Sequence, residues 1–153
     1  MSGNKNYARE ITVSASPSVA YSALTEGIDR WWTTTSNPIT SAGDAVTFSF
    51  KPTYWKMRVR QMVPEKLIEL VCIEAHHVHA GLPESIREEW LGTVLRWRIE
   101  PQAGGTRIVF EHEGLVPALN CYNICEAGWD HFFLNSLKSY LDTGKGIPGE
   151  IGA

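Results

Sequence analysis

An amphipathic segment near the end of the chain, residues 120–143, constrains the possible folds more than any other stretch. Its bulky side chains recur at spacings of three and four residues, which is the period of an α-helix. They are Tyr122, Cys125, Trp129, Phe132, Phe133, Leu137, Tyr140 and Leu141. A helix with so aromatic a stripe needs a wide apolar surface to pack against, and we expect the preceding chain to supply that surface as a β-sheet.

Both ends of this helix carry termination signals. Asn123, with Glu126 three residues later, has the form of an N-terminal capping box, and Asn120 is a rival start. At the other end, Gly144 can take the left-handed conformation that commonly follows a helix. We therefore predict one long helix with a defined beginning and end.

The middle of the chain has the period of two that is typical of half-buried antiparallel strands. Six segments show this alternation or a short apolar run: residues 7–14, 46–50, 55–60, 67–75, 90–100 and 106–113. Residues 33–40 are polar and contain Pro38, so we expect a loop with one further short strand there. After the first segment, Ser16-Pro17 begins a short helix, Gly27 ends it, and a second short helical piece ends at Trp31-Trp32. This order predicts an α+β domain in which an antiparallel sheet packs on the long helix.

The length and net charge of the chain limit the number of domains and the kinds of binding partner. With 153 residues, the chain is expected to form a single domain over residues 1–153, with the Gly/Pro-containing residues 144–153 as a loose tail. No apolar run approaches the ~18 residues of a membrane span, and no signal-peptide core follows the polar N-terminus, so we expect a cytoplasmic protein. The net charge of -3, without a block of Lys and Arg, argues against nucleic acid as a partner.

Few residues have the spacing of a catalytic or metal site, and the chain has no Gly-x-Ser-x-Gly, P-loop or Gly-x-Gly-x-x-Gly motif. His76, His77 and His79, near Glu74, contain a pair two residues apart that could bind zinc from one strand face, but no third and fourth ligand has a recognisable spacing. Cys121 and Cys125 would share a helix face, where a metal or a disulfide is conceivable and packed free thiols are favoured. We expect no catalytic residue, no metal and no cofactor.

The final helix and three other stretches resemble a known family. The helix contains Gly128-Trp129-Asp130, Leu137-Lys138-Ser139-Tyr140-Leu141 and Gly144. The other stretches are Ile11-Thr12-Val13 with Ser16-Pro17 and Val19, Trp31-Trp32, and Gly104-Gly105-Thr106-Arg107-Ile108 followed by His112-Glu113-Gly114-Leu115. Together they are similar to the Hsp90-ATPase-activator-homologue group within the START / Bet v 1-like (SRPBCC) superfamily. The resemblance implies the helix-grip fold, a curved antiparallel sheet wrapped around a long C-terminal helix, with a deep cavity between them.

Our first hypothesis is a protein that holds a small hydrophobic or amphipathic molecule in that cavity. We expect the ligand-binding side chains on the strand faces, loop and helix stripe that surround it: Trp32, Phe48, Phe50, Leu95, Trp97, Ile108, Phe110, His112, Trp129 and Phe133. The alternative is that these aromatic residues simply fill the core. We place the mouth of the cavity beneath residues 80–85 and 33–38, where Gly and Pro interrupt the strands.

Other functions stay open at this point. The resemblance implies a co-chaperone-like contact with an Hsp90-type ATPase, and a homodimer is a further possibility. His112 could orient a ligand, or it could be a core histidine bonded to a backbone group. A cyclase or hydrolase that pairs His112 with a glutamate is the third hypothesis, although the pairs Glu88-Glu89 and Glu111/Glu113 are expected to be solvated.

Overall fold

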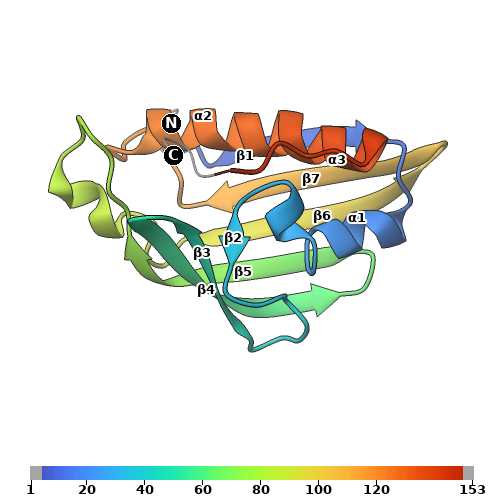
Figure 1. Cartoon of the computed structure of the whole chain (residues 1–153), viewed down its shortest axis with the longest axis horizontal. Coiled ribbons are helices and arrows are strands. Elements are labelled where there is room, and N and C mark those ends of the chain that lie inside the picture. Colours follow the sequence, from blue (N-terminus) through green and yellow to red (C-terminus); the bar gives the residue numbers. More distant parts are fainter. Residues whose placement is uncertain (1–4, 150–153) are drawn as a thin grey trace.

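One curled seven-stranded antiparallel sheet lies beneath a long C-terminal helix in the computed structural model, which describes residues 5–149 (Figure 1). The strands are β1 (Tyr7–Val13), β2 (Thr34–Thr35), β3 (Ala45–Phe50), β4 (Thr53–Val63), β5 (Leu67–His76), β6 (Val94–Gln102) and β7 (Gly105–Glu113). Their order is β1-β7-β6-β5-β4-β3-β2, and each neighbouring pair is antiparallel. The α+β helix-grip class predicted from the sequence is confirmed.

The C-terminal helix is continuous but is not α-helical throughout. Its parts are α2 (Tyr122–Trp129), the π-helical η4 (Asp130–Leu137) and α3 (Lys138–Thr143). A π-helix has a wider turn than an α-helix. Within η4 the adjacent side chains Phe132 and Phe133 are both buried. The extent of the predicted helix is confirmed, whereas its regular period of 3.6 residues is wrong over η4.

The two ends of this helix are stabilised in different ways. Gly144 has φ 84° and caps the C-terminus in the left-handed conformation, as predicted. At the other end Cys121 is the cap residue, and its side chain makes no capping hydrogen bond. The carboxylate of Glu89 instead accepts hydrogen bonds from the backbone N–H groups of Asn120 (3.1 Å) and Cys121 (3.0 Å). Capping by Asn120 or Asn123 is therefore wrong, because a residue from a distant loop occupies that place.

Two short helices follow β1, as predicted. They are α1 (Pro17–Ala23), which Ser16 caps through its side-chain oxygen, and the 3₁₀ helix η2 (Ile28–Arg30). The indole N–H of Trp31 donates to the carbonyl oxygen of Ala23 at 2.7 Å. This hydrogen bond fixes the second helix against the first. A further 3₁₀ helix, η3 (Glu84–Glu88), lies in the connection between β5 and β6.

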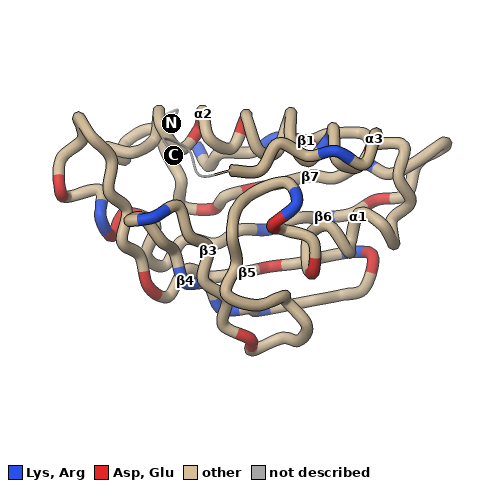
Figure 2. Tube along the Cα trace, viewed as in Figure 1, with Lys and Arg blue, Asp and Glu red and all other residues tan. Residues whose placement is uncertain are grey.

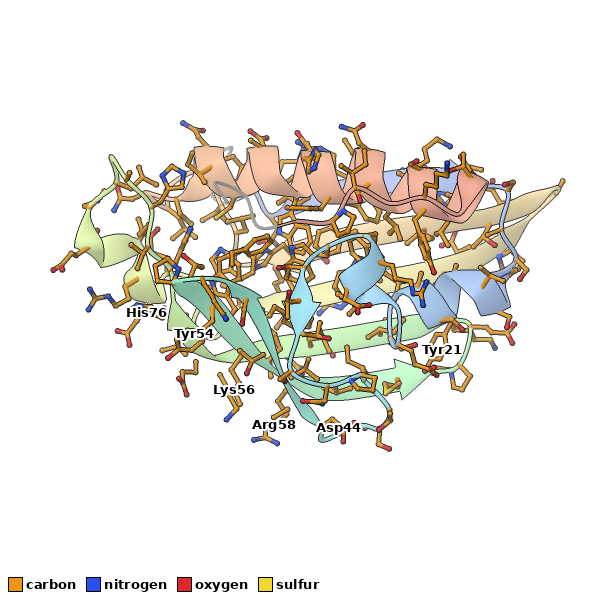
Figure 3. All side chains as sticks on the ribbon, viewed as in Figure 1. Tyr21, Asp44, Tyr54, Lys56, Arg58 and His76 are labelled. Atoms are coloured by element: carbon orange, nitrogen blue, oxygen red, sulfur yellow. The ribbon has the colours of Figure 1, made fainter. Side chains whose placement is uncertain are left out.

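The strands direct alternate side chains toward the helix and toward the outer surface. On β4, Trp55, Met57 and Val59 are buried beneath the helix, while Lys56 and Arg58 project from the opposite face (Figure 3). The alternation predicted from the sequence is therefore the alternation between core and solvent.

Positive and negative residues are interspersed along the strands (Figure 2). Arg96 forms ion pairs with Glu69, Glu111 and Glu113, so these glutamates belong to a cross-strand charge network. Among the helices of the described residues, none combines the length and the apolarity needed to cross a membrane.

Residues 144–149, the first part of the predicted tail, return along the helix. The backbone N–H of Ile147 donates to Ser136 Oγ at 2.6 Å, and that of Gly149 donates to the carbonyl oxygen of Trp32 at 3.1 Å. Ser139 Oγ also donates to the carbonyl oxygen of Lys145. The segment therefore makes specific contacts as far as Gly149, and the rest of the predicted tail, residues 150–153, lies outside the described residues.

We predict that Phe133→Ala lowers the free energy of unfolding by about 3–5 kcal/mol, because it removes a fully buried ring and leaves a cavity. Urea denaturation would measure the loss. Leu91→Ala is the matched control: Leu91 is 48% exposed, so its truncation should cost less than about 0.5 kcal/mol. A loss below about 1 kcal/mol for Phe133→Ala would show that the helix does not depend on this contact.

Candidate functional site

A cavity of about 340 Å³ lies at one end of the interface between helix and sheet. Its wall comes from α2 and the start of η4, the turn between β3 and β4, and the chain that follows β5. The lining residues are Trp32, Phe50, Lys51, Pro52, Thr53, Trp55, His77, Val78, His79, Ala80, Trp90, Ile124, Cys125, Gly128, Trp129 and Phe132. The volume is within the range of roughly 300–1,000 Å³ that is usual for small-molecule sites.

Indole rings form much of the wall. Trp55 and Trp90 are stacked, with ring centroids 4.1 Å apart and an interplanar angle of 17°. Trp90 lies nearly parallel to Trp129 at 6.0 Å, and Trp129 contacts Trp32 at 4.7 Å. The cavity is thus bordered by a connected group of four tryptophans, a surface suited to apolar and planar molecules.

The predicted ligand-binding residues divide into two groups. Trp32, Phe50 and Trp129 line the cavity. The other seven are buried in the packed core and do not line it: Phe48, Leu95, Trp97, Ile108, Phe110, His112 and Phe133. Phe133 belongs to the helix, and the other six face it, as the strand alternation predicts, but the helix side chains fill the space above them. For example, Phe110 packs against Phe133 with ring centroids 5.2 Å apart.

His112 is a fully buried core residue whose two ring nitrogens both have partners. The indole N–H of Trp129 donates to Nδ1 at 3.0 Å, so Nε2 carries the proton and donates to Thr93 Oγ1 at 2.9 Å. Thr93 in turn donates to the carbonyl oxygen of Trp90. Burial lowers the pKa of His112 to about 3, which keeps the ring neutral. Neither nitrogen is left for a ligand or for the glutamate of the enzyme hypothesis.

The mouth of the cavity lies partly where the sequence suggests. Ala80, at the start of the predicted loop, lines the wall together with Val78 and His79. The other side is formed by residues 51–53 of the β3–β4 turn and not by residues 33–38, because β2 pairs with β3 and holds that segment at the edge of the sheet.

Sequence reasoning missed several lining residues, among them Trp55, Trp90 and Gly128. Trp55 lies on the inward face of its strand, and this alternation was visible in the sequence. Gly128 is unusual in the middle of an aromatic helix stripe, where glycine lowers helix stability. A Cβ added to Gly128 would have no heavy atom within 4 Å. The missing side chain therefore contributes to the open volume.

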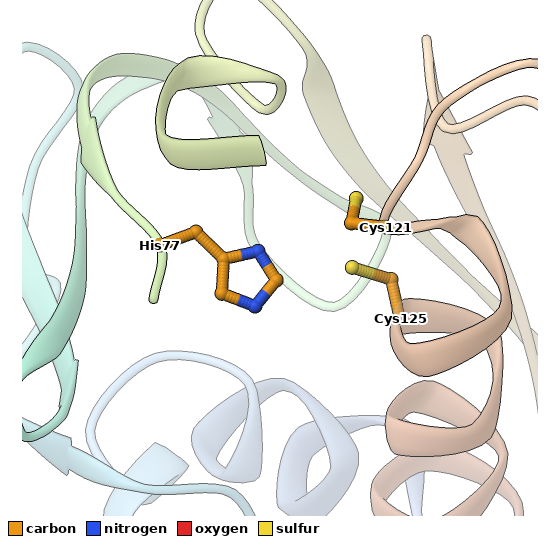
Figure 4. Close-up of side chains that lie close together, drawn as sticks. All are labelled: His77, Cys121 and Cys125. Atoms are coloured by element: carbon orange, nitrogen blue, oxygen red, sulfur yellow. The ribbon is translucent and has the colours of Figure 1, made fainter. Parts of the chain in front are cut away.

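One corner of the cavity contains potential metal ligands. His77 and Cys125 line the wall, and Cys121 lies close to both (Figure 4). The sequence pattern paired His77 with His79 instead. His79 is exposed, and its Nδ1 lies 2.8 Å from the carbonyl oxygen of Ala80.

The fold and the cavity together define a helix-grip protein with an internal pocket beside its C-terminal helix. Residues 14–142 match the family model described as Activator of Hsp90 ATPase homolog 1-like protein, and the chain belongs to this family. The resemblance seen in the sequence motifs is thereby confirmed. A search of curated protein sequences finds no match.

Several solved structures share the fold. The Aha1 dimer from Colwellia psychrerythraea is 27% identical, with a TM-score of 0.74 over 93% of this chain and 99% of that chain. Protein MLL2253 from Mesorhizobium loti is 20% identical, with a TM-score of 0.72 over 90% of this chain and 96% of that one. DynU16, a putative protein in the dynemicin biosynthetic locus, is 18% identical, with a TM-score of 0.70 over 92% and 48% of the two chains. The last two show a common fold alone.

We predict that Trp129→Phe destabilises the protein by about 1–3 kcal/mol more than Trp97→Phe does, since it leaves Nδ1 of His112 buried without a donor. Trp97 is the matched control because it is equally large and fully buried, and its indole nitrogen has no hydrogen-bond partner among the described residues. Urea denaturation of both variants gives the comparison. Equal losses would mean that the Trp129–His112 hydrogen bond contributes nothing to stability.

Proposed function

We propose that this protein binds a small hydrophobic or amphipathic molecule in the cavity between the sheet and the C-terminal helix. The observation that supports this most directly is the cavity itself, with about 340 Å³ of space beside four tryptophans. A void of this size lined by aromatic rings forgoes the packing contacts that a filled core would make. A ligand that covers those rings recovers the contacts and removes apolar surface from water.

The wall suggests the chemistry of the ligand. Its apolar or planar part would lie against the indoles of Trp55, Trp90 and Trp129, where stacking and area burial both contribute. The polar residues Lys51 and His79 line the same cavity and are exposed to solvent. A polar or anionic group at one end of the ligand would therefore point toward these two residues.

We predict that amphipathic ligands with an apolar body bind saturably and quench the tryptophan emission. Gly128→Leu should weaken this binding by about tenfold or more, because the new side chain enters the cavity. The helix should tolerate the change, since leucine favours the helix over glycine by roughly 0.8–1 kcal/mol. Fluorescence titration with a panel of fatty acids and polycyclic aromatic compounds measures both proteins.

Ala127→Leu is the matched control for this experiment. Ala127 is the neighbouring helix residue and is exposed, so the same side chain there adds its volume to solvent and not to the cavity. Binding to the wild type and to Ala127→Leu should be equal. Absence of saturable binding by the wild type would contradict the proposed function, and equal binding by Gly128→Leu would place the ligand elsewhere.

A chaperone contact is the second candidate, and the family match over residues 14–142 favours it. If this chain acts as a co-chaperone, adding it to an Hsp90-type ATPase should raise the rate of ATP hydrolysis. Gly128→Leu should raise the rate equally, because a protein contact would use the outer surface. An unchanged ATPase rate at saturating concentrations of the chain would count against this candidate.

Assembly and compartment complete the proposal. The relative from Colwellia psychrerythraea is described as a dimer, and we include a homodimer of this chain on that basis. All three cysteines are free thiols, which fits a reducing compartment such as the cytoplasm.

A further inference from the structure

Three potential metal ligands from two distant parts of the chain meet at one end of the cavity. His77 directly follows β5, while Cys121 and Cys125 are four residues apart at the start of α2 (Figure 4). All three side chains are buried, and their ligand atoms lie within 4.8 Å of one another. His77 and Cys125 also line the cavity, so the cluster has one open side.

The imidazole of His77 lacks a partner that its burial would normally require. His77 is 6% exposed, and its Nδ1 has no hydrogen-bond partner among the described residues. A buried polar atom in this condition is destabilising, and native proteins almost always satisfy such atoms. The imidazole of His77 therefore has a buried ring nitrogen whose bonding capacity a metal ion would satisfy.

The surroundings of the two sulfurs suit a metal site. The indole N–H of Trp90 donates to Cys125 Sγ at 3.2 Å, and such outer contacts orient a ligand and stabilise its negative charge. Glu89 holds the backbone at Cys121 through a 3.0 Å hydrogen bond. The ring of Trp55 packs against His77 with centroids 5.1 Å apart. Each of the three ligand residues is thus positioned by a neighbour.

We propose that His77, Cys121 and Cys125 bind a zinc ion whose fourth coordination position faces the cavity. Two cysteines and one histidine are a known zinc ligand set, and a fourth position taken by water or substrate distinguishes reactive zinc sites from structural ones. Tetrahedral zinc would place the ligand atoms about 3.5–3.8 Å apart, given bonds of about 2.3 Å to sulfur and about 2.0 Å to nitrogen. Changes in side-chain torsions can close the difference of about 1 Å.

Charge neutralisation by the ligands would lower the cost of burying the zinc ion. Binding displaces the two thiol protons to solvent, and the two thiolates then neutralise the double positive charge of zinc. This inference goes beyond the proposed function and does not depend on it, because metal binding is measured without an organic ligand.

The test is a cobalt titration of the full chain, freed of metal by a chelator under reducing conditions. We expect about one equivalent of Co²⁺ to bind, with visible d–d bands of tetrahedral cobalt and a sulfur-to-cobalt charge-transfer band in the near ultraviolet. An equivalent of Zn²⁺ should abolish these bands. Absence of a tetrahedral spectrum in the wild type, or recovery of Cys121 and Cys125 only as a disulfide, would overturn the proposal.

Substitutions assign the ligands. Cys121→Ser, Cys125→Ser and His77→Gln should each weaken metal affinity on the order of 100-fold. Cys72→Ser is the matched control: Cys72 is also buried, and its Sγ donates to the carbonyl oxygen of Glu74 on β5. Unchanged affinity in both cysteine variants of the cluster would exclude the site.

A second measurement uses the wild type alone, in case a variant does not fold. Zinc should protect Cys121 and Cys125 from alkylation and leave the modification rate of Cys72 unchanged, as peptide mass spectrometry would show. Equal protection of all three thiols would indicate general stabilisation of the fold and would contradict a site at this corner.

The open position has its own readout. Imidazole added to the cobalt protein should shift the d–d bands, because it can reach the metal through the cavity. An unchanged spectrum would mean that a protein group closes the coordination shell, with the nearby carboxylate of Glu89 as the first candidate, and would refute the open position.

Discussion

The contact between Trp129 and β7 joins the C-terminal helix to the sheet. The indole packs against Phe110 at 4.6 Å between ring centroids, and its N–H donates to His112. Nε2 of His112 donates to Thr93 Oγ1, and Thr93 in turn donates to the carbonyl oxygen of Trp90. A continuous polar chain therefore runs from the helix through the buried histidine to the segment before β6. It holds Trp90 and Trp129, two walls of the cavity, in a defined relative position.

The connection between β5 and β6 controls the helix start as well as the cavity. It supplies Glu89, which accepts hydrogen bonds from the backbone N–H groups of Asn120 and Cys121 at the start of the helix, and Trp90, whose indole N–H donates to Cys125. Negative charge at this end also interacts favourably with the helix dipole. A change in this connection would therefore affect three features together: the helix start, the indole wall and the positions of the two sulfurs.

The interface between helix and sheet is filled along most of its length and open at one end. Phe133 and Leu137 of the helix are fully buried above the sheet, so the strand residues beneath them become core. Toward the start of the helix, Gly128 presents no side chain, and the volume stays open. The position of the cavity thus follows from the size of the helix side chains and not from the polarity of the strands.

The class of fold could be predicted from the sequence, because hydrophobic period and the residues that start or end a helix are local properties. The period of two in the strands and the aromatic stripe over residues 120–143 indicate which face is buried. Ser16 indicates where α1 starts, and Gly144 indicates where the C-terminal helix ends. The hydrogen bonds between Glu89 and the helix start and the π-helical segment could be seen only in the tertiary structure. The same holds for the extent of the cavity and for the proximity of His77 to Cys121 and Cys125. A periodic pattern shows that a side chain is buried but not which distant residue it meets. A cavity is the space that neighbouring side chains leave unfilled, and which side chains are neighbours is known only from the folded chain.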